Sequence, residues 1–118
     1  MQKLSPKIIR QQYVIEGYYK IKVDEEAIDD YFDDLADTLM LKDSGLNTLL
    51  SSLEDDIEEN ESYFAFRPFI DSGISLSIWN EESFLSVIIF AHRSFDEKKA
   101  LAFTRKFFQM SDQIAKDF

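Results

Sequence analysis

The stretch FIDSGISLSIWNEESFLSVIIFAH, from Phe69 to His92, reads as two strands joined by a turn. Apolar and small polar side chains alternate along ISLSIW, and SFLSVIIFA is rich in β-branched and aromatic residues, as strands are. Turn-forming residues precede the first strand at 71–73 and separate the two strands at 80–82. The stretch therefore predicts an antiparallel hairpin. It also raises the question whether Ser72 and His92, the only histidine, fill a turn and a strand end or belong to an active site.

Further strands are predicted before the hairpin. The run YFAFRPFI (63–70) adds a third strand to an antiparallel meander, and QQYVIEGYYKIKV (11–23) has the aromatic and β-branched composition of a strand. LNTLLSSL (46–53) fits a short strand or a helical turn, and we favour the strand. Residues 42–45 are expected to form a turn, and the acidic run EDDIEENE (54–61) a solvated loop.

Two helices are predicted from their caps and apolar stripes. Asp24 is a capping residue followed by two glutamates, and a helix is expected from there to about Leu41. Ser94, followed three residues later by Glu97, has the form of a capping box and opens a second helix. The buried stripes are Ile28, Tyr31, Phe32, Leu35 and Leu39 in the first helix, and Ala100, Leu101, Phe103, Phe107, Phe108 and Met110 in the second.

The order of these elements predicts an α+β fold, a two-layer α/β sandwich in which two helices cover one face of a mostly antiparallel sheet. The helices would cover Ile74, Leu76, Ile78, Leu85, Val87, Ile89 and Ala91, since side chains alternate along a strand. The opposite face would carry Trp79, Phe84, Ile88 and Phe90 beside Ser75, Ser77, Ser86 and His92. That apolar area is large to leave in water, so we predict a homodimer packed sheet on sheet in four layers.

Composition restricts the possible partners. The 118 residues, 45% of them hydrophobic, are expected to form a single domain over 1–118. A net charge of −10 disfavours binding to nucleic acid or to an anionic membrane surface. The sequence has no cysteine, no apolar run near the roughly 20 residues that a bilayer-spanning helix needs, and no secretion-signal pattern. We therefore expect a cytoplasmic protein.

No metal site is predicted from the acidic residues. Those on the first helix line one face, which a solvated outer surface explains; they are Glu26, Asp30, Asp33 and Asp37. The acidic run 54–61 lacks the glycine and the alternating ligands of a calcium-binding loop.

The central stretch resembles the core of bacterial S-adenosylmethionine decarboxylase, the pyruvoyl enzyme of spermidine synthesis. The family pattern is roughly E-S-H-x-x-I-H-T-W-P-E, followed by a strand ending in F-T-C. Here the chain reads D-S-G-I-S-L-S-I-W-N-E from Asp71 and then F-A-H from Phe90, with Trp79 and Glu81 at the matching positions. FDEKKALAF (95–103) is similar to the start of the helix that follows in the family. The order of elements agrees from about residue 11 to 110, and the resemblance implies the same two-layer protomer and dimer.

The resemblance also implies a chemistry and its residues. In the family a serine attacks the carbonyl before it, an N-to-O shift gives an ester, and elimination leaves a pyruvoyl cofactor that forms a Schiff base with the substrate. The serine position is Ser72 here. The position of a histidine that handles protons during processing is Ser77, and that of a cysteine that donates a proton in turnover is His92. The nucleophile is thus kept, while both proton-transfer groups differ.

Three interpretations follow. A serine hydroxyl cannot replace a near-neutral base. Our leading hypothesis is therefore an S-adenosylmethionine decarboxylase-like protein of the polyamine-synthesis family that stays unprocessed and is inactive or weakened. It would bind S-adenosylmethionine or a related ligand. In the first alternative the chain is an active decarboxylase with a pyruvoyl group derived from Ser72 and with His92 as proton donor. In the second alternative it is a non-catalytic regulatory or structural partner subunit.

Overall fold

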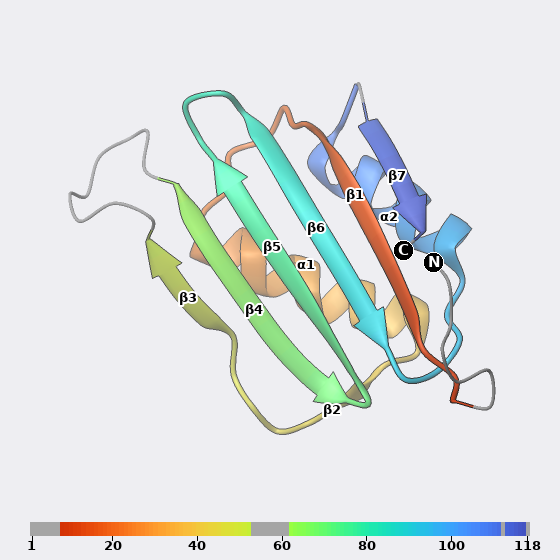
Figure 1. The fold of residues 1–118 in the computed structure, drawn as a ribbon. Coiled ribbons are helices and arrows are strands. Elements are labelled where there is room, and N and C mark those ends of the chain that lie inside the picture. Colours follow the sequence, from red (N-terminus) through yellow and green to blue (C-terminus); the bar gives the residue numbers. More distant parts are fainter. Residues whose placement is uncertain (1–7, 53–61, 112, 118) are drawn as a thin grey trace.

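The computed structural model describes residues 8–52, 62–111 and 113–117, and it confirms the predicted α+β architecture of an antiparallel sheet with two helices (Figure 1). The loop expected at 54–61 lies outside the described residues, as does Leu53. The elements are β1 (Gln11–Tyr18), α1 (Glu25–Leu39), β2 (Lys42–Asp43), β3 (Leu49–Ser52), β4 (Tyr63–Ile70), β5 (Ser72–Trp79), β6 (Phe84–Ala91), α2 (Glu97–Phe108) and β7 (Gln113–Asp117).

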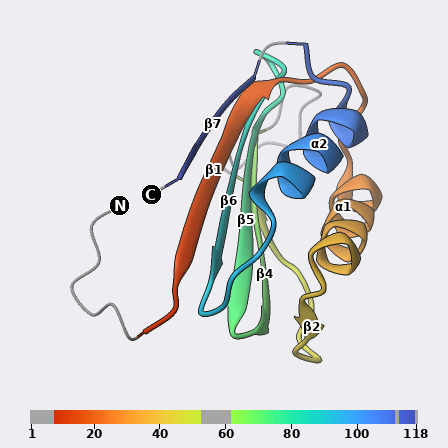
Figure 2. The ribbon, with the colours of Figure 1, turned by 90° about the vertical axis from the view of Figure 1, so that its right-hand side faces the viewer.

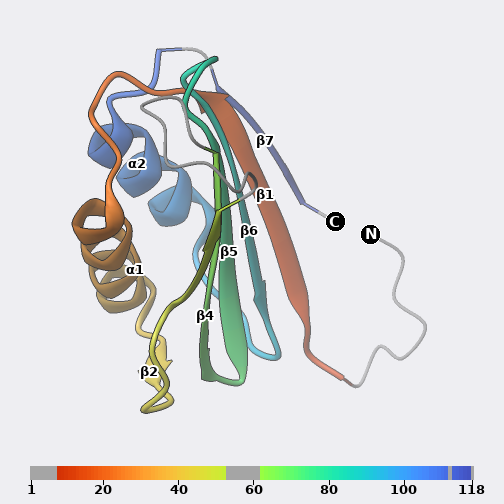
Figure 3. The same cartoon turned by 90° about the vertical axis from the view of Figure 1, so that its left-hand side faces the viewer.

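Among the described residues the sheet has seven strands, in the order β2-β4-β5-β6-β1-β7, with β3 also paired to β4. The predicted meander β4-β5-β6 forms its centre, and β5 pairs with β6 without interruption from Ser72 opposite Ala91 to Trp79 opposite Phe84. β1 lies on the far side of β6, so the first strand of the described chain lies inside the sheet, between β6 and the edge strand β7. Both helices lie on the same side of the sheet, as Figures 2 and 3 show.

The strands differ from the prediction in three places. β1 ends at Tyr18, not near residue 23, because the amides of Tyr19 and Lys20 donate to Ser83 and Phe108 instead of continuing a ladder. Residues 42–43, predicted as part of a turn, form the short strand β2 against Ile70 and Phe69. β7 was not predicted, since its polar sequence QIAKD becomes a strand only through pairing with β1.

The helix caps agree with the sequence in one case and differ in the other. Asp24 caps α1 as predicted, and its carboxylate accepts a hydrogen bond from the Ala27 amide at 2.9 Å. α2 is capped by Asp96, which accepts from the Lys99 amide at 3.1 Å, and not by Ser94. The capping box fails because Glu97 is already the first helical residue, and its carboxylate accepts instead from the Gln11 side chain at 2.9 Å.

Arg67 on β4 attaches α1 to the sheet, a role that the sequence did not reveal. Its guanidinium donates to Asp29 at 2.9 Å and to Asp33 on the helix, and to the Thr48 hydroxyl at 2.8 Å. The guanidinium carbon also lies 5.5 Å from the ring centre of Phe32. Arg67 therefore holds α1 against the helix-side face of the sheet.

The core lies between the helices and the sheet, and Tyr31 is at its centre. The Tyr31 side chain is fully buried, and its ring contacts those of Phe32, Phe103, Phe107 and Phe108 at centroid distances of 4.7–6.0 Å. Its hydroxyl shares a 2.8 Å hydrogen bond with Thr104 of α2. The two helices are therefore joined by an aromatic cluster with one satisfied polar pair inside it.

Stability should fall in alkali because of this tyrosine. Burial raises the pKa of Tyr31 above its ordinary value of 10.0, and the hydrogen bond to Thr104 offsets this only in part. Below that ordinary pKa both states are protonated and the group has no pH effect; above it only the unfolded chain ionises, so the free energy of unfolding falls as pH rises. Urea unfolding between about pH 9 and about pH 11 measures this slope. Tyr31→Phe should flatten the slope, and equal slopes for both proteins would contradict the assignment.

Candidate functional site

The sheet face that points away from the helices is largely apolar, and we call it the open face. Its residues are the alternate positions of the central strands: Phe64, Phe66, Pro68 and Ile70 on β4, Gly73, Ser75, Ser77 and Trp79 on β5, and Phe84, Ser86, Ile88 and Phe90 on β6. The other alternate positions, among them Ile74, Leu76, Val87 and Ile89, are fully buried under the helices, as predicted. Among the described residues the exposed large apolar side chains on this face are Tyr18, Leu49, Phe64, Ile70, Ile88 and Ile114.

The open face has an aromatic group at each end of β5 and serines between them. At one end the rings of Phe66 and Phe90 are stacked at 6.3 Å, and at the other Phe84 contacts both Trp79 and Tyr18 at 5.7 and 5.3 Å. Ser75, Ser77 and Ser86 lie between these groups, and Ser77 is directly opposite Ser86. The serines therefore lie on the open face between two groups of aromatic side chains.

Gly73 allows the first aromatic pair to cover the strand. A Cβ atom at this position would lie 2.7 Å from a carbon of the Phe90 ring and 2.9 Å from one of Phe66. The two rings therefore occupy the space that a side chain directly after Ser72 would need. The family pattern has histidine at this position, so the chain differs from it in the packing beside the serine as well.

Ser72 faces the helix layer. It is the first residue of β5 and is 6% exposed. Its side chain points to the same face of the sheet as the buried side chains of Ile74 and Leu76, which are alternate positions of the same strand. Its hydroxyl makes a long hydrogen bond of 3.4 Å to the carbonyl of Ile70. The predicted nucleophile thus lies in a buried position at the start of a strand.

The structure separates Ser77 from Ser72. Because the register of β5 has no bulge, positions five residues apart point to opposite faces of the sheet. Ser77 therefore lies on the open face in the middle of β5, half-buried between Phe64 and Ser86. Its hydroxyl is not placed to exchange a proton with that of Ser72.

The backbone of His92 lies next to the Asp71–Ser72 peptide bond, whereas its side chain is exposed. The His92 amide donates a 2.7 Å hydrogen bond to the carbonyl of Asp71. Asp71 adopts a left-handed conformation with φ of 67°, which aspartate tolerates better than most residues and which turns β4 into β5. The feature that the sequence missed is therefore a backbone one: an N–H group held on the carbonyl before Ser72.

Gln11 orders the loop that carries His92. Its side-chain amide donates to the Phe95 carbonyl at 3.1 Å and to Glu97, and its oxygen accepts from the Phe95 amide at 3.1 Å. A glutamine at the start of a strand gives no recognisable signal in the sequence, because its partner loop is 84 residues away. Among the described residues, no group of side chains is placed to hold a metal ion, and no helix is long and apolar enough to cross a membrane.

Comparison with known proteins gives a structural match. No protein-family model and no curated protein matches the sequence. The crystal structure of the adenosylmethionine decarboxylase from Aquifex aeolicus VF5 superposes with a TM-score of 0.68, and the match covers 94% of this chain and 89% of that one. The chain has the adenosylmethionine decarboxylase fold. Sequence identity to that decarboxylase is 9%, so the similarity is one of fold.

Proposed function

We propose that this chain is a non-catalytic protein with the adenosylmethionine decarboxylase fold, which stays a single unprocessed chain, pairs with a second copy through the open face, and binds S-adenosylmethionine or a related ligand between the two sheets. Polyamine synthesis is the pathway that the resemblance implies. The observation that carries the proposal concerns Ser72, which is 6% exposed on the helix side of the sheet and whose hydroxyl has a backbone carbonyl, and no side chain, as its hydrogen-bond partner among the described residues.

Among the described residues, no side chain is hydrogen-bonded to the Ser72 hydroxyl to carry the proton transfers of processing. An N-to-O shift needs a base for the serine proton and a group that protonates the leaving nitrogen. The hydroxyl of Ser72 has the Ile70 carbonyl as its described partner, and a carbonyl cannot accept a full proton at neutral pH. Ser77 lies on the other face, and the exposed His92 side chain makes no hydrogen bond to the Ser72 hydroxyl within the described part of the chain.

The open face supports binding to a second copy. Monomeric proteins rarely leave a continuous apolar face of this kind in water, and the same face of a second copy is equally apolar. Both helices lie on the other side of the sheet, and no further element of the described chain covers the open face (Figures 2 and 3). Sheet-on-sheet packing would bring the serines of two copies together around a partly polar space, where a small ligand could lie.

One observation favours slow self-processing as a second candidate function. The carbonyl of Asp71 is the one that Ser72 would attack, and the His92 amide already donates to it at 2.7 Å. An N–H group in this position would stabilise the negative charge that develops on the carbonyl oxygen. Cleavage would leave a pyruvoyl group derived from Ser72, and the His92 imidazole would be the group able to donate a proton in decarboxylation.

Intact mass distinguishes the two functions. We expect the purified chain to keep its full mass during prolonged incubation at neutral pH, with the same result for Ser72→Ala. Two fragments that meet at residue 72, with a new carbonyl that borohydride reduces, would contradict the proposal and support the second candidate. The ligand is examined with the same unbroken protein: S-adenosylmethionine should raise the melting temperature, because a ligand that binds only the folded state stabilises it. No rise would leave a structural dimer.

A further inference from the structure

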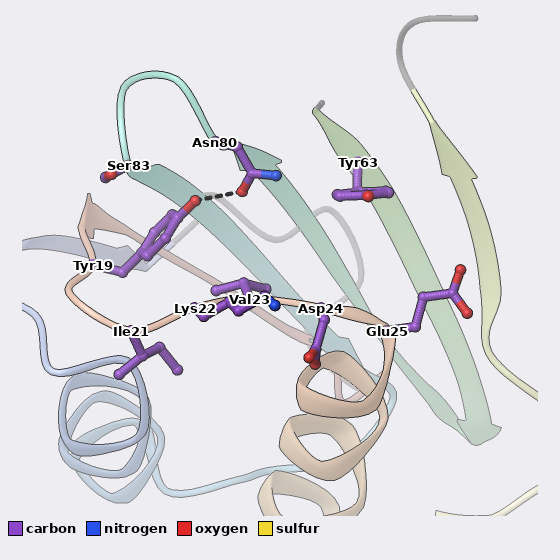
Figure 4. Close-up of a pocket in the computed structure, with 9 residues that line it drawn as sticks. All are labelled: Tyr19, Ile21, Lys22, Val23, Asp24, Glu25, Tyr63, Asn80 and Ser83. Atoms are coloured by element: carbon purple, nitrogen blue, oxygen red, sulfur yellow. Dashed lines mark hydrogen bonds between the residues drawn. The ribbon is translucent and has the colours of Figure 1, made fainter. Parts of the chain in front are cut away.

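A second candidate binding site lies at the other end of β5, on the helix side of the sheet. A groove-like cavity of about 600 Å³ is lined by Tyr19 and residues 21–25 between β1 and α1, by Tyr63 at the start of β4, and by Asn80 and Ser83 of the β5–β6 turn (Figure 4). Its volume is in the range of small-molecule sites. Asn80 follows the last residue of β5 and Ser72 is the first, so the length of the strand separates this cavity from the Asp71–Ser72 bond.

Hydrogen bonds hold one wall of the cavity in place. The Tyr19 side chain is 7% exposed, its hydroxyl donates to the Asn80 side chain at 2.7 Å, and its amide donates to the Ser83 carbonyl at 2.8 Å. Burial, and secondarily the charge of Glu82, raise the pKa of Tyr19. Figure 4 shows the Tyr63 ring on the opposite side of Asn80 from Tyr19. Two aromatic rings and an amide thus form a preorganised wall.

Two opposite charges line the facing wall. Lys22 and Glu25 are exposed residues of the β1–α1 connection and of the first turn of α1, and neither has an ion pair within the described part of the chain. The carboxylate of Asp24 between them already caps α1. The cavity therefore offers one ammonium and one carboxylate to a ligand, a short distance apart along the chain.

We propose that this cavity binds a zwitterionic α-amino acid, with the ligand ammonium at Glu25, the ligand carboxylate at Lys22 and the ligand side chain against Tyr19 and Tyr63. A simple anion would meet Asp24 and Glu25 in a protein of net charge −10, and a simple cation would leave the Lys22 ammonium without a partner. A zwitterion matches both charges. The site lies on the helix side, so a second copy on the open face would leave it accessible.

Three probes that share a phenylethyl skeleton and differ in their charged groups test the proposal. L-phenylalanine carries both charges, phenethylamine lacks the carboxylate and 3-phenylpropionate lacks the ammonium. NMR titration of the full chain should give the tightest binding for L-phenylalanine, with the loss of either ligand charge costing up to about fivefold in Kd, as expected for partly solvated ion pairs. The amides that shift should be those of residues 19–25 and 80–83.

Matched variants connect each ligand charge to one side chain. In Lys22→Met, L-phenylalanine and phenethylamine should bind equally, and in Glu25→Gln, L-phenylalanine and 3-phenylpropionate should bind equally. Lys98→Met, an exposed lysine of α2, should keep the wild-type order. Equal Kd values for all three probes with the wild type, an unchanged order in both cavity variants, or no binding of L-phenylalanine would overturn the proposal. These readouts do not depend on chain cleavage, on dimer formation or on S-adenosylmethionine, so they are separate from the proposed function.

Discussion

Tyr31→Ala should lower the free energy of unfolding by about 4–5 kcal/mol, which is the upper part of the range for truncation of a large buried ring. The ring is fully buried among four phenylalanines that belong to both helices, so its removal leaves a cavity where α1 meets α2. The variant also leaves the buried Thr104 hydroxyl without its partner. Since small domains have about 5–15 kcal/mol of stability in total, this loss is a large fraction of the stability of the chain. Urea denaturation followed by circular dichroism measures the change.

Tyr31→Phe separates packing from hydrogen bonding in that result. It keeps the ring and removes the hydroxyl, so only the bond to Thr104 is lost, and we expect a cost of about 1–3 kcal/mol. Lys98→Gln is the control: it replaces one exposed good helix former of α2 by another and should change the free energy of unfolding little. An effect of Tyr31→Ala no larger than that of Tyr31→Phe would show that the aromatic cluster does not hold the helices together.

Ile88→Lys should convert the proposed dimer to monomer at micromolar concentration. Ile88 lies on β6 near the middle of the sheet, is 41% exposed, and its side chain points outward on the open face. In a two-fold sheet-on-sheet packing a lysine here would place a charge from each copy in an apolar interface without a partner, which costs several kcal/mol. Sedimentation velocity or light scattering over a dilution series measures the change in assembly.

Two controls make that result specific. Ile88→Glu should dissociate the dimer as well, because the cost is the burial of a charge and not its sign. Ala102→Lys adds the same charge on the exposed side of α2 and should leave the dimer intact. Monomeric wild-type protein at tens of micromolar, or a dimer that Ile88→Lys leaves unchanged, would contradict pairing through the open face. Circular dichroism of Ile88→Lys should stay that of a folded chain, since the side chain makes no part of the helix-side core.

The candidate site could be predicted from the sequence only in part. The alternation of β5 and β6 assigned the two faces of the hairpin correctly, because a period of two decides which side chains share a face. The same alternation places Ser72 and Ser77 on opposite faces. Spacing could not indicate that the His92 amide donates to the Asp71 carbonyl, since that contact depends on the left-handed turn at Asp71 and on the pairing of β5 with β6.

The sequence by itself determined which segments become helices and central strands, because the period of apolar residues and the aspartate before α1 act within a few residues. Tertiary structure alone decided where β1 ends, that Asp96 and not Ser94 caps α2, and that residues 113–117 add a last strand. In each of these cases a hydrogen-bond partner far away in the sequence competes with the local preference. Arg67 and Gln11 follow the same rule, since the groups that they bind come together only when the helices pack on the sheet.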